Sequence, residues 1–97
     1  MHTDEKASVT LRLPSTLSAY SGGKSQIVLS ANTIEELLGA LKVQHLSVWE
    51  RLCDEQGHLR EHVKMFVSNI VISGSNGLDT PLKSGQEVIV LPVSTHF

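Results

Sequence analysis

The sequence is poor in the features that define several specialised classes of protein. It has one cysteine, Cys53, which excludes an internal disulfide framework and favours a cytoplasmic setting. No apolar run approaches the roughly 18–20 residues of a membrane span, and residues 1–6 lack the basic-then-apolar order of a signal peptide. The formal net charge of −2 gives neither a basic footprint for nucleic acid nor an acidic tail. We therefore expect a cytoplasmic globular protein that binds neither nucleic acid nor a membrane.

The length sets the expected domain organisation. A chain of 97 residues can bury one hydrophobic core and is too short for two. We expect residues 1–97 to form a single domain, with residues 1–7 as a flexible N-terminal segment.

The N-terminal third predicts two strands. Residues 8–13 alternate apolar and polar side chains at the period of a half-buried strand, and Pro14 ends it because proline has no amide hydrogen to donate. A polar loop containing Gly22 and Gly23 follows, and the β-branched run at residues 26–30 predicts the second strand of a hairpin.

A helix is predicted from residue 34 onward. Asn32 or Thr33 can cap its free amides, and Glu35 and Glu36 lie in the first turn, where the helix dipole favours carboxylates. One face of this helix is apolar and is expected to pack on a sheet; it consists of Ile34, Leu37, Leu38 and Leu41.

A second, shorter helical stretch is predicted to end near Gly57. Its apolar positions are Leu46, Trp49, Leu52 and Cys53. Trp49 is interpreted as a lid on the core, with a partner-facing position as the alternative. Cys53 on this face is interpreted as a small core residue.

The C-terminal half predicts the remaining strands. They lie at residues 63–67, at 70–72 after a bend at Ser68-Asn69, and at 87–91, closed by Pro92. A tight turn at residues 78–82 is expected to place Leu78 and Leu82 in the core.

This order of elements predicts an α+β domain in which one main helix lies across a mixed sheet. If the first and last strands are central neighbours, they run parallel. The segment after the last strand, residues 93–97, would then protrude from the end of the sheet.

Several stretches together resemble a known family. They are residues 33–38 (TIEELL), 57–67 (GHLREHVKMFV), 77–88 (GLDTPLKSGQEV) and Leu91-Pro92. In order and spacing they are similar to the small ubiquitin-like sulfur carriers of molybdopterin and thiazole biosynthesis, the ThiS/MoaD-like family, from about Val9 to Pro92. The resemblance implies a ubiquitin-like β-grasp fold and a non-enzymatic protein that works with a protein partner similar to an activating enzyme or to a synthase large subunit.

In that family a terminal Gly-Gly is adenylated and converted to a thiocarboxylate. The two residues are glycines because an extended tail without side chains can thread a narrow tunnel. Here His96 and Phe97 occupy the Gly-Gly register, and no glycine follows Gly85. We therefore expect an interaction module that docks through its open sheet face and its tail. The expected partner-binding tail consists of Val93, Ser94, Thr95, His96 and Phe97. Two alternatives stay open: a sulfur carrier with an atypical C-terminus, and a homodimer formed through the sheet.

Other chemistry is not supported by the sequence. His58 and His62 have metal-ligand spacing only on a helix, and Gly57 and the strand at residue 63 argue against a helix there. The stretch 22–25 (GGKS) lacks the upstream glycine of a phosphate-binding loop. We expect no catalytic residue, no metal site and no bound cofactor.

Overall fold

The computed structural model describes residues 6–92 and contains five strands and three short or medium helices, with one 3-10 turn. The strands are β1 (Ser8–Arg12), β2 (Gln26–Ser30), β3 (Val63–Val67), β4 (Ile70–Ile72) and β5 (Glu87–Pro92). The helices are α1 (Ser15–Ser18), α2 (Ile34–Gln44) and α3 (Leu46–Leu52), and the 3-10 turn is η1 (Ala19–Ser21).

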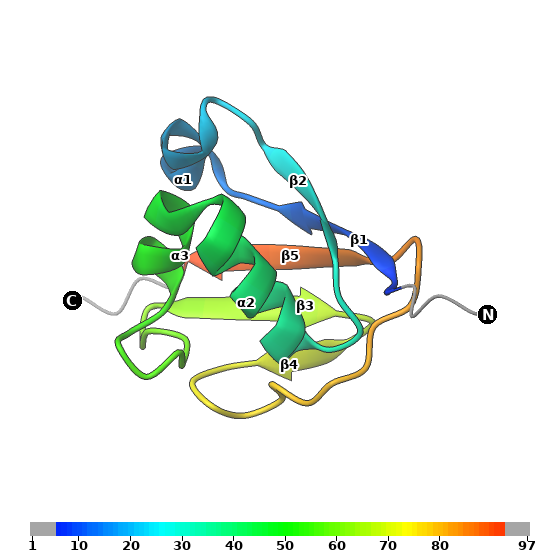
Figure 1. The fold of residues 1–97 in the computed structure, drawn as a ribbon. Coiled ribbons are helices and arrows are strands. Elements are labelled where there is room, and N and C mark those ends of the chain that lie inside the picture. Colours follow the sequence, from blue (N-terminus) through cyan, green and yellow to red (C-terminus); the bar gives the residue numbers. More distant parts are fainter. Residues whose placement is uncertain (1–5, 93–97) are drawn as a thin grey trace.

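The strands form one mixed sheet in the order β2-β1-β5-β3-β4. β1 and β5 are central neighbours and run parallel, as expected of the first and last strands if they were neighbours, and every other pair is antiparallel. In Figure 1, α2 crosses in front of the sheet, and α3 lies at the end of the sheet where β5 finishes. This architecture is the ubiquitin-like β-grasp fold, so the predicted fold class is confirmed.

The core lies between α2, α3 and the inner face of the sheet. Alternate residues of the strands, such as Val9 and Leu11 in β1 and Val88 and Val90 in β5, point into it and are buried. The predicted apolar face of α2 is buried in full. The buried faces of β1 and α2 follow from periodicity, because a period of 2 and a period of 3.6 each collect apolar side chains on a single face. In β5 both faces are apolar, so packing decides that Val88 and Val90 are the buried ones.

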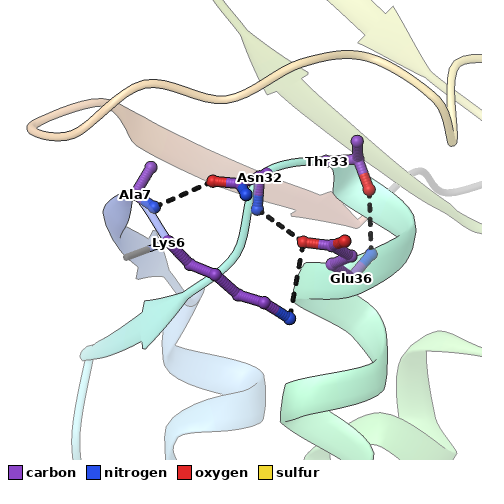
Figure 2. Close-up of polar contacts among 5 residues, drawn as sticks. All are labelled: Lys6, Ala7, Asn32, Thr33 and Glu36. Atoms are coloured by element: carbon purple, nitrogen blue, oxygen red, sulfur yellow. Dashed lines mark hydrogen bonds and ion pairs between the residues drawn. The ribbon is translucent and has the colours of Figure 1, made fainter. Parts of the chain in front are cut away.

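The start of α2 is fixed by its side chains. The Thr33 hydroxyl oxygen accepts a hydrogen bond from the Glu36 amide at 3.2 Å, so Thr33 is the N-cap. The Glu36 carboxylate accepts a hydrogen bond from the backbone amide of Asn32 at 2.8 Å and lies 3.7 Å from the Lys6 ammonium nitrogen. Figure 2 shows the Asn32 side chain turned the other way, to accept from the Ala7 amide. The chain is thus tied to the helix from Lys6 onward.

Two details of the sequence prediction are wrong. The stretch after Pro14 is not a simple polar loop: it folds into α1 and η1, and half-buried Leu17 packs against the core. The strand predicted to close before Pro92 extends through it, paired with Val63. Proline is tolerated there because the pairing of β5 with β1 ends at Ile89, so that side of β5 needs no donor at residue 92.

The orientation of α3 also differs from the prediction. Its buried residues are Val48 and Leu52, whereas Leu46 is 50% exposed. The helix ends at Leu52, because Cys53 is extended and bridges to Leu59; the chain turns at Gly57 later. A single non-helical residue, His45, separates α3 from α2 and redirects the chain, so the face of α3 that meets the core is set by packing.

Two turns connect the elements of the C-terminal half. Ser68 and Asn69 both have positive φ, 48° and 70°, and form the two-residue connection between β3 and β4. The predicted turn at residues 78–82 is confirmed: Leu82 is buried and Leu78 packs against the core. Backbone hydrogen bonds from this turn to the start of α2 hold both segments together.

Candidate protein-docking face

The predicted tail residues lie outside the described residues. Val93, Ser94, Thr95, His96 and Phe97 follow directly after β5, whose last residue, Pro92, pairs with Val63 at the start of β3. The part of the expected docking surface that the structure describes is the sheet.

The outer face of the sheet is the surface opposite α2 and α3. Strand residues that alternate with the core positions lie on it, because successive side chains of a strand point to opposite faces. Its apolar centre, here called the open-face patch, consists of Phe66, Val71, Ile89 and Leu91. Val71, Ile89 and Leu91 are 46%, 40% and 39% exposed, and Phe66 is half-buried.

Strand register brings these residues together. Ile89 on β5 is opposite Phe66 on β3, and Phe66 is in turn opposite Val71 on β4. Leu91 lies two residues along β5 from Ile89, on the same face. The patch therefore spans three strands that are adjacent in the sheet: β3 and β4, which are consecutive in the sequence, and β5, which follows about fifteen residues after β4.

Charged residues border the patch. Lys64 is opposite Leu91, and Arg12 on β1 is opposite Ile89. The Arg12 guanidinium nitrogen Nη1 lies 3.3 Å from Oε2 of Glu87, and both side chains are about half exposed, so this ion pair adds little stability. An apolar centre with a polar, charged rim is the arrangement that protein–protein interfaces use.

The histidines singled out in the sequence lie apart from this face. His58 is half-buried in the loop after α3, and His62 is exposed just before β3. Within residues 6–92, no three His, Cys, Asp or Glu side chains gather closely enough to hold a metal ion. The stretch 22–25 joins η1 to β2 and starts no helix.

Cys53 is a core residue, as the sequence predicted. Its side chain is fully buried, and burial, assisted by the nearby Asp54 carboxylate, raises the pKa of the thiol to about 12. A thiol in this environment is a poor nucleophile, since the reactive form is the thiolate.

Sequence comparison relates the chain to sulfur carriers. It is 29% identical over 86 residues to the protein named sulfur carrier protein CysO of Mycobacterium tuberculosis, covering 87% of this chain and 92% of that protein. No protein-family model matches the chain.

Solved structures show the same fold. The crystal structure of M. tuberculosis CysO superposes with a TM-score of 0.76 at 28% identity, covering 89% of this chain and 99% of that one. CysO in the BexX/CysO complex of Amycolatopsis orientalis gives a TM-score of 0.77 at 24% identity, covering 92% and 99%. The small archaeal modifier protein 1 of Methanosarcina acetivorans gives 0.75 at 21%, covering 95% and 98%.

Within residues 6–92, none of the helices has the length and apolar character that crossing a membrane requires. The relatives named above include a sulfur carrier and a protein solved in complex with a partner. In sequence and in fold, the chain therefore resembles the ThiS/MoaD-like family of ubiquitin-like sulfur carriers, as the sequence motifs indicated.

Proposed function

We propose that this chain is a non-catalytic β-grasp protein of the cytoplasm that acts by docking onto a protein partner through its open-face patch. The observation that carries the proposal is the alignment of Phe66, Val71 and Ile89 across three strands of the sheet. Val71 and Ile89 are 40% or more exposed, so a partner that covers these apolar side chains lowers the free energy by removing their surface from water.

The proposal assigns recognition to the patch and selectivity to its rim. Arg12 and Lys64 place positive charge beside the apolar centre, and Glu87 neutralises part of it. A partner surface with an apolar centre and carboxylates at the matching positions would fit this face. In the proposal, residues 93–97 contact the same partner, because they follow β5, the strand that carries Ile89 and Leu91.

A catalytic role for the chain has little support among the described residues. The thiol of Cys53 is buried and has a raised pKa, and no grouping of His58 or His62 with further metal ligands is found in residues 6–92. We propose docking without sulfur transfer because His96 and Phe97 carry side chains in the register where the family has two glycines.

Sulfur carriage is the second candidate function, and the similarity to CysO favours it. The two candidates share the docking face, since a carrier must also bind its activating enzyme. They differ in whether the C-terminal carboxylate is converted to a thiocarboxylate.

Site-specific photo-crosslinking tests the docking face. A photoreactive amino acid is placed at Ile89 in the full chain, which is then expressed in its native host. The matched control carries it at Lys24, which is exposed in the loop between η1 and β2 and belongs neither to the open-face patch nor to α2. We expect a defined adduct with a host protein from position 89 and none from position 24. The adduct should disappear when Leu91→Lys is added. Equal adducts at both positions, or none at position 89, would contradict the proposal.

Intact-mass measurement separates the two candidate functions. The chain is incubated with ATP, a sulfur source and an activating enzyme from the same organism, beside a variant in which His96 and Phe97 are both replaced by glycine. We expect oxygen-for-sulfur exchange in the Gly-Gly variant alone. Exchange in the natural chain would establish sulfur carriage and reject docking without transfer, while leaving the docking face intact.

A further inference from the structure

A groove on the helical side of the molecule is separate from the open-face patch. It lies between α2, Trp49 of α3, the loop at residues 55–58 and Leu78, and no strand contributes to its lining. We call it the Trp49 groove. Its volume is about 290 Å³, at the lower limit of pockets that hold a whole small-molecule ligand, and it is large enough for one or two protein side chains.

One wall of the groove is a face of α2. Glu35, Gly39 and Lys42 lie at positions i, i+4 and i+7, so they follow one another along the helix. A glycine inside a helix costs about 1 kcal/mol relative to alanine. Packing within the described part of the chain does not require it, because a Cβ at Gly39 would meet no atom within 4 Å. The missing side chain leaves the middle of the groove open.

The opposite wall is held in place by hydrogen bonds. The Asp54 carboxylate accepts from the amides of Gln56 and His58 at 2.9 and 3.0 Å, which closes the loop at residues 54–58. Cys53 bridges to Leu59 behind it. Because these hydrogen bonds already order the loop, ligand binding costs little conformational entropy there.

A lysine side chain of the protein already contacts the aromatic ring of the groove. The Lys42 ammonium lies 4.6 Å from the centroid of the Trp49 ring, the geometry of a cation–π contact. Lys42 is exposed and has a long flexible stem, so it can leave the ring at small cost. A guanidinium is a better group for this position, because it is planar, stacks on aromatic rings and is less strongly hydrated than an ammonium.

The charge of the lining favours a basic ligand. Glu35 and Glu55 supply two carboxylates, against the single lysine that is already engaged with the ring. These carboxylates oppose the binding of phosphates and acidic peptides and can pair with a guanidinium. Leu38 and Leu78 supply apolar surface for neighbouring aliphatic groups.

We propose that the Trp49 groove binds an extended segment of a partner protein that inserts an arginine side chain, stacking its guanidinium on Trp49 and displacing Lys42. This contact is independent of the open-face patch and lies on another side of the molecule. A partner could therefore hold the chain by both surfaces, or two partners could bind it at once.

The test uses the full chain and blocked pentapeptides of sequence Ser-Leu-Arg-Leu-Ser, with citrulline in place of arginine as the uncharged control of equal shape. Trp49 is the only tryptophan, so its fluorescence reports directly on the groove, and amide NMR shifts locate the contact. We expect the arginine peptide to bind at least about fivefold more tightly than the citrulline peptide. The shifts should cluster at Gly39, Trp49 and Gly57.

Two variants give opposite expected effects. Gly39→Leu fills the groove while raising helix propensity, so the fold is retained and peptide binding is lost. Lys42→Ala removes the competing ammonium and should tighten binding about two- to fivefold. Lys24→Ala is the matched control, because it removes a lysine outside the groove and should leave the affinity unchanged.

Four results with the peptides and variants would each overturn the proposal. They are equal binding of the arginine and citrulline peptides, shifts confined to the sheet, unchanged binding by Gly39→Leu, and weaker binding by Lys42→Ala. Concentration-dependent shifts of the groove amides without any peptide would identify a second copy of this chain as the occupant, and would likewise reject a partner segment.

Discussion

Ile89 and Phe66 face each other across strands β5 and β3, at the centre of the outer face of the sheet. Ile89 is 40% exposed, although its neighbours along the strand, Val88 and Val90, are buried on the other side. A strand with apolar side chains on both faces is typical of sheets that are covered on both sides. Here the described helices cover one face, and in the proposed function a partner covers the other.

The first prediction concerns this pair. Ile89→Arg should weaken binding to the crosslinked partner by at least about tenfold, because a charge at the centre of an apolar contact loses its hydration without gaining a partner. The unfolding free energy should fall by about 1 kcal/mol, because Ile89 is partly buried and the new arginine lies opposite Arg12. Calorimetric titration and urea unfolding measure the two quantities.

Val43→Arg is the control for that prediction, because it adds the same charge at an exposed position on α2. If both variants bind as the natural chain does, the open-face patch is not the docking surface.

The second prediction concerns the cap of α2. Thr33→Ala should lower the unfolding free energy by about 1 kcal/mol, because the Glu36 amide loses the hydroxyl oxygen that accepts its hydrogen bond. Thr33→Ser keeps that oxygen and should remain close to the natural chain. Urea unfolding followed by circular dichroism distinguishes them, and equal losses in both variants would show that the methyl group matters and the cap does not.

The third prediction separates two glycines that have nearly the same positive φ. Gly77 has φ +86°, and a Cβ there would lie 2.6 Å from Cδ1 of the buried Ile72. Gly23 has φ +87°, and a Cβ there would meet nothing within 4 Å. Gly23→Ala should cost about 1–2 kcal/mol from backbone strain alone. Gly77→Ala should cost about 2–4 kcal/mol, because overpacking of the core is added.

Thermal and urea unfolding of the two glycine variants measure this difference. A Gly77→Ala variant that is no less stable than Gly23→Ala would mean that Ile72 moves aside without loss, and that the turn at residue 77 is not sterically coupled to the core.

The fourth prediction follows from the raised pKa of Cys53. The thiol has an ordinary pKa near 9 when the chain is unfolded and about 12 when it is folded, so the unfolded chain loses this proton first as the pH rises. The contribution of Cys53 to stability is therefore complete below pH 9 and declines as the pH rises from about 9 toward 12. Cys53→Ala removes this component.

Urea unfolding of both chains at pH 7, 8, 9 and 10 isolates the thiol, because the other titrating groups are common to the two. The natural chain should lose stability relative to Cys53→Ala above about pH 9. A difference between the chains that is independent of pH would show that the thiol titrates normally in the fold.

The sequence by itself was enough for the fold class. The alternation in residues 8–13 and the apolar face of residues 34–41 predicted the first strand and the main helix, because those periods reflect which face is buried. The short apolar run at residues 87–91 predicted the last strand without showing which of its faces is buried. It also predicted the buried state of Cys53, which is confirmed. From the sequence, the first and last strands were expected to be parallel only if they were neighbours, and the structure shows that β1 and β5 are neighbours and are parallel. The tail residues 93–97, on which the sequence placed partner binding, lie outside the described residues.

The tertiary structure decided the rest. In α3, Val48 and Leu52 are buried and Leu46 is not, because a seven-residue helix is too short for its period to fix the buried face and His45 redirects the chain before it. The open-face patch and the Trp49 groove each join residues distant in the sequence, through strand register in one and through the packing of α2 against a loop in the other. Local sequence patterns determine which face of an element is apolar, but only the packing of all elements determines which apolar and aromatic groups stay exposed together.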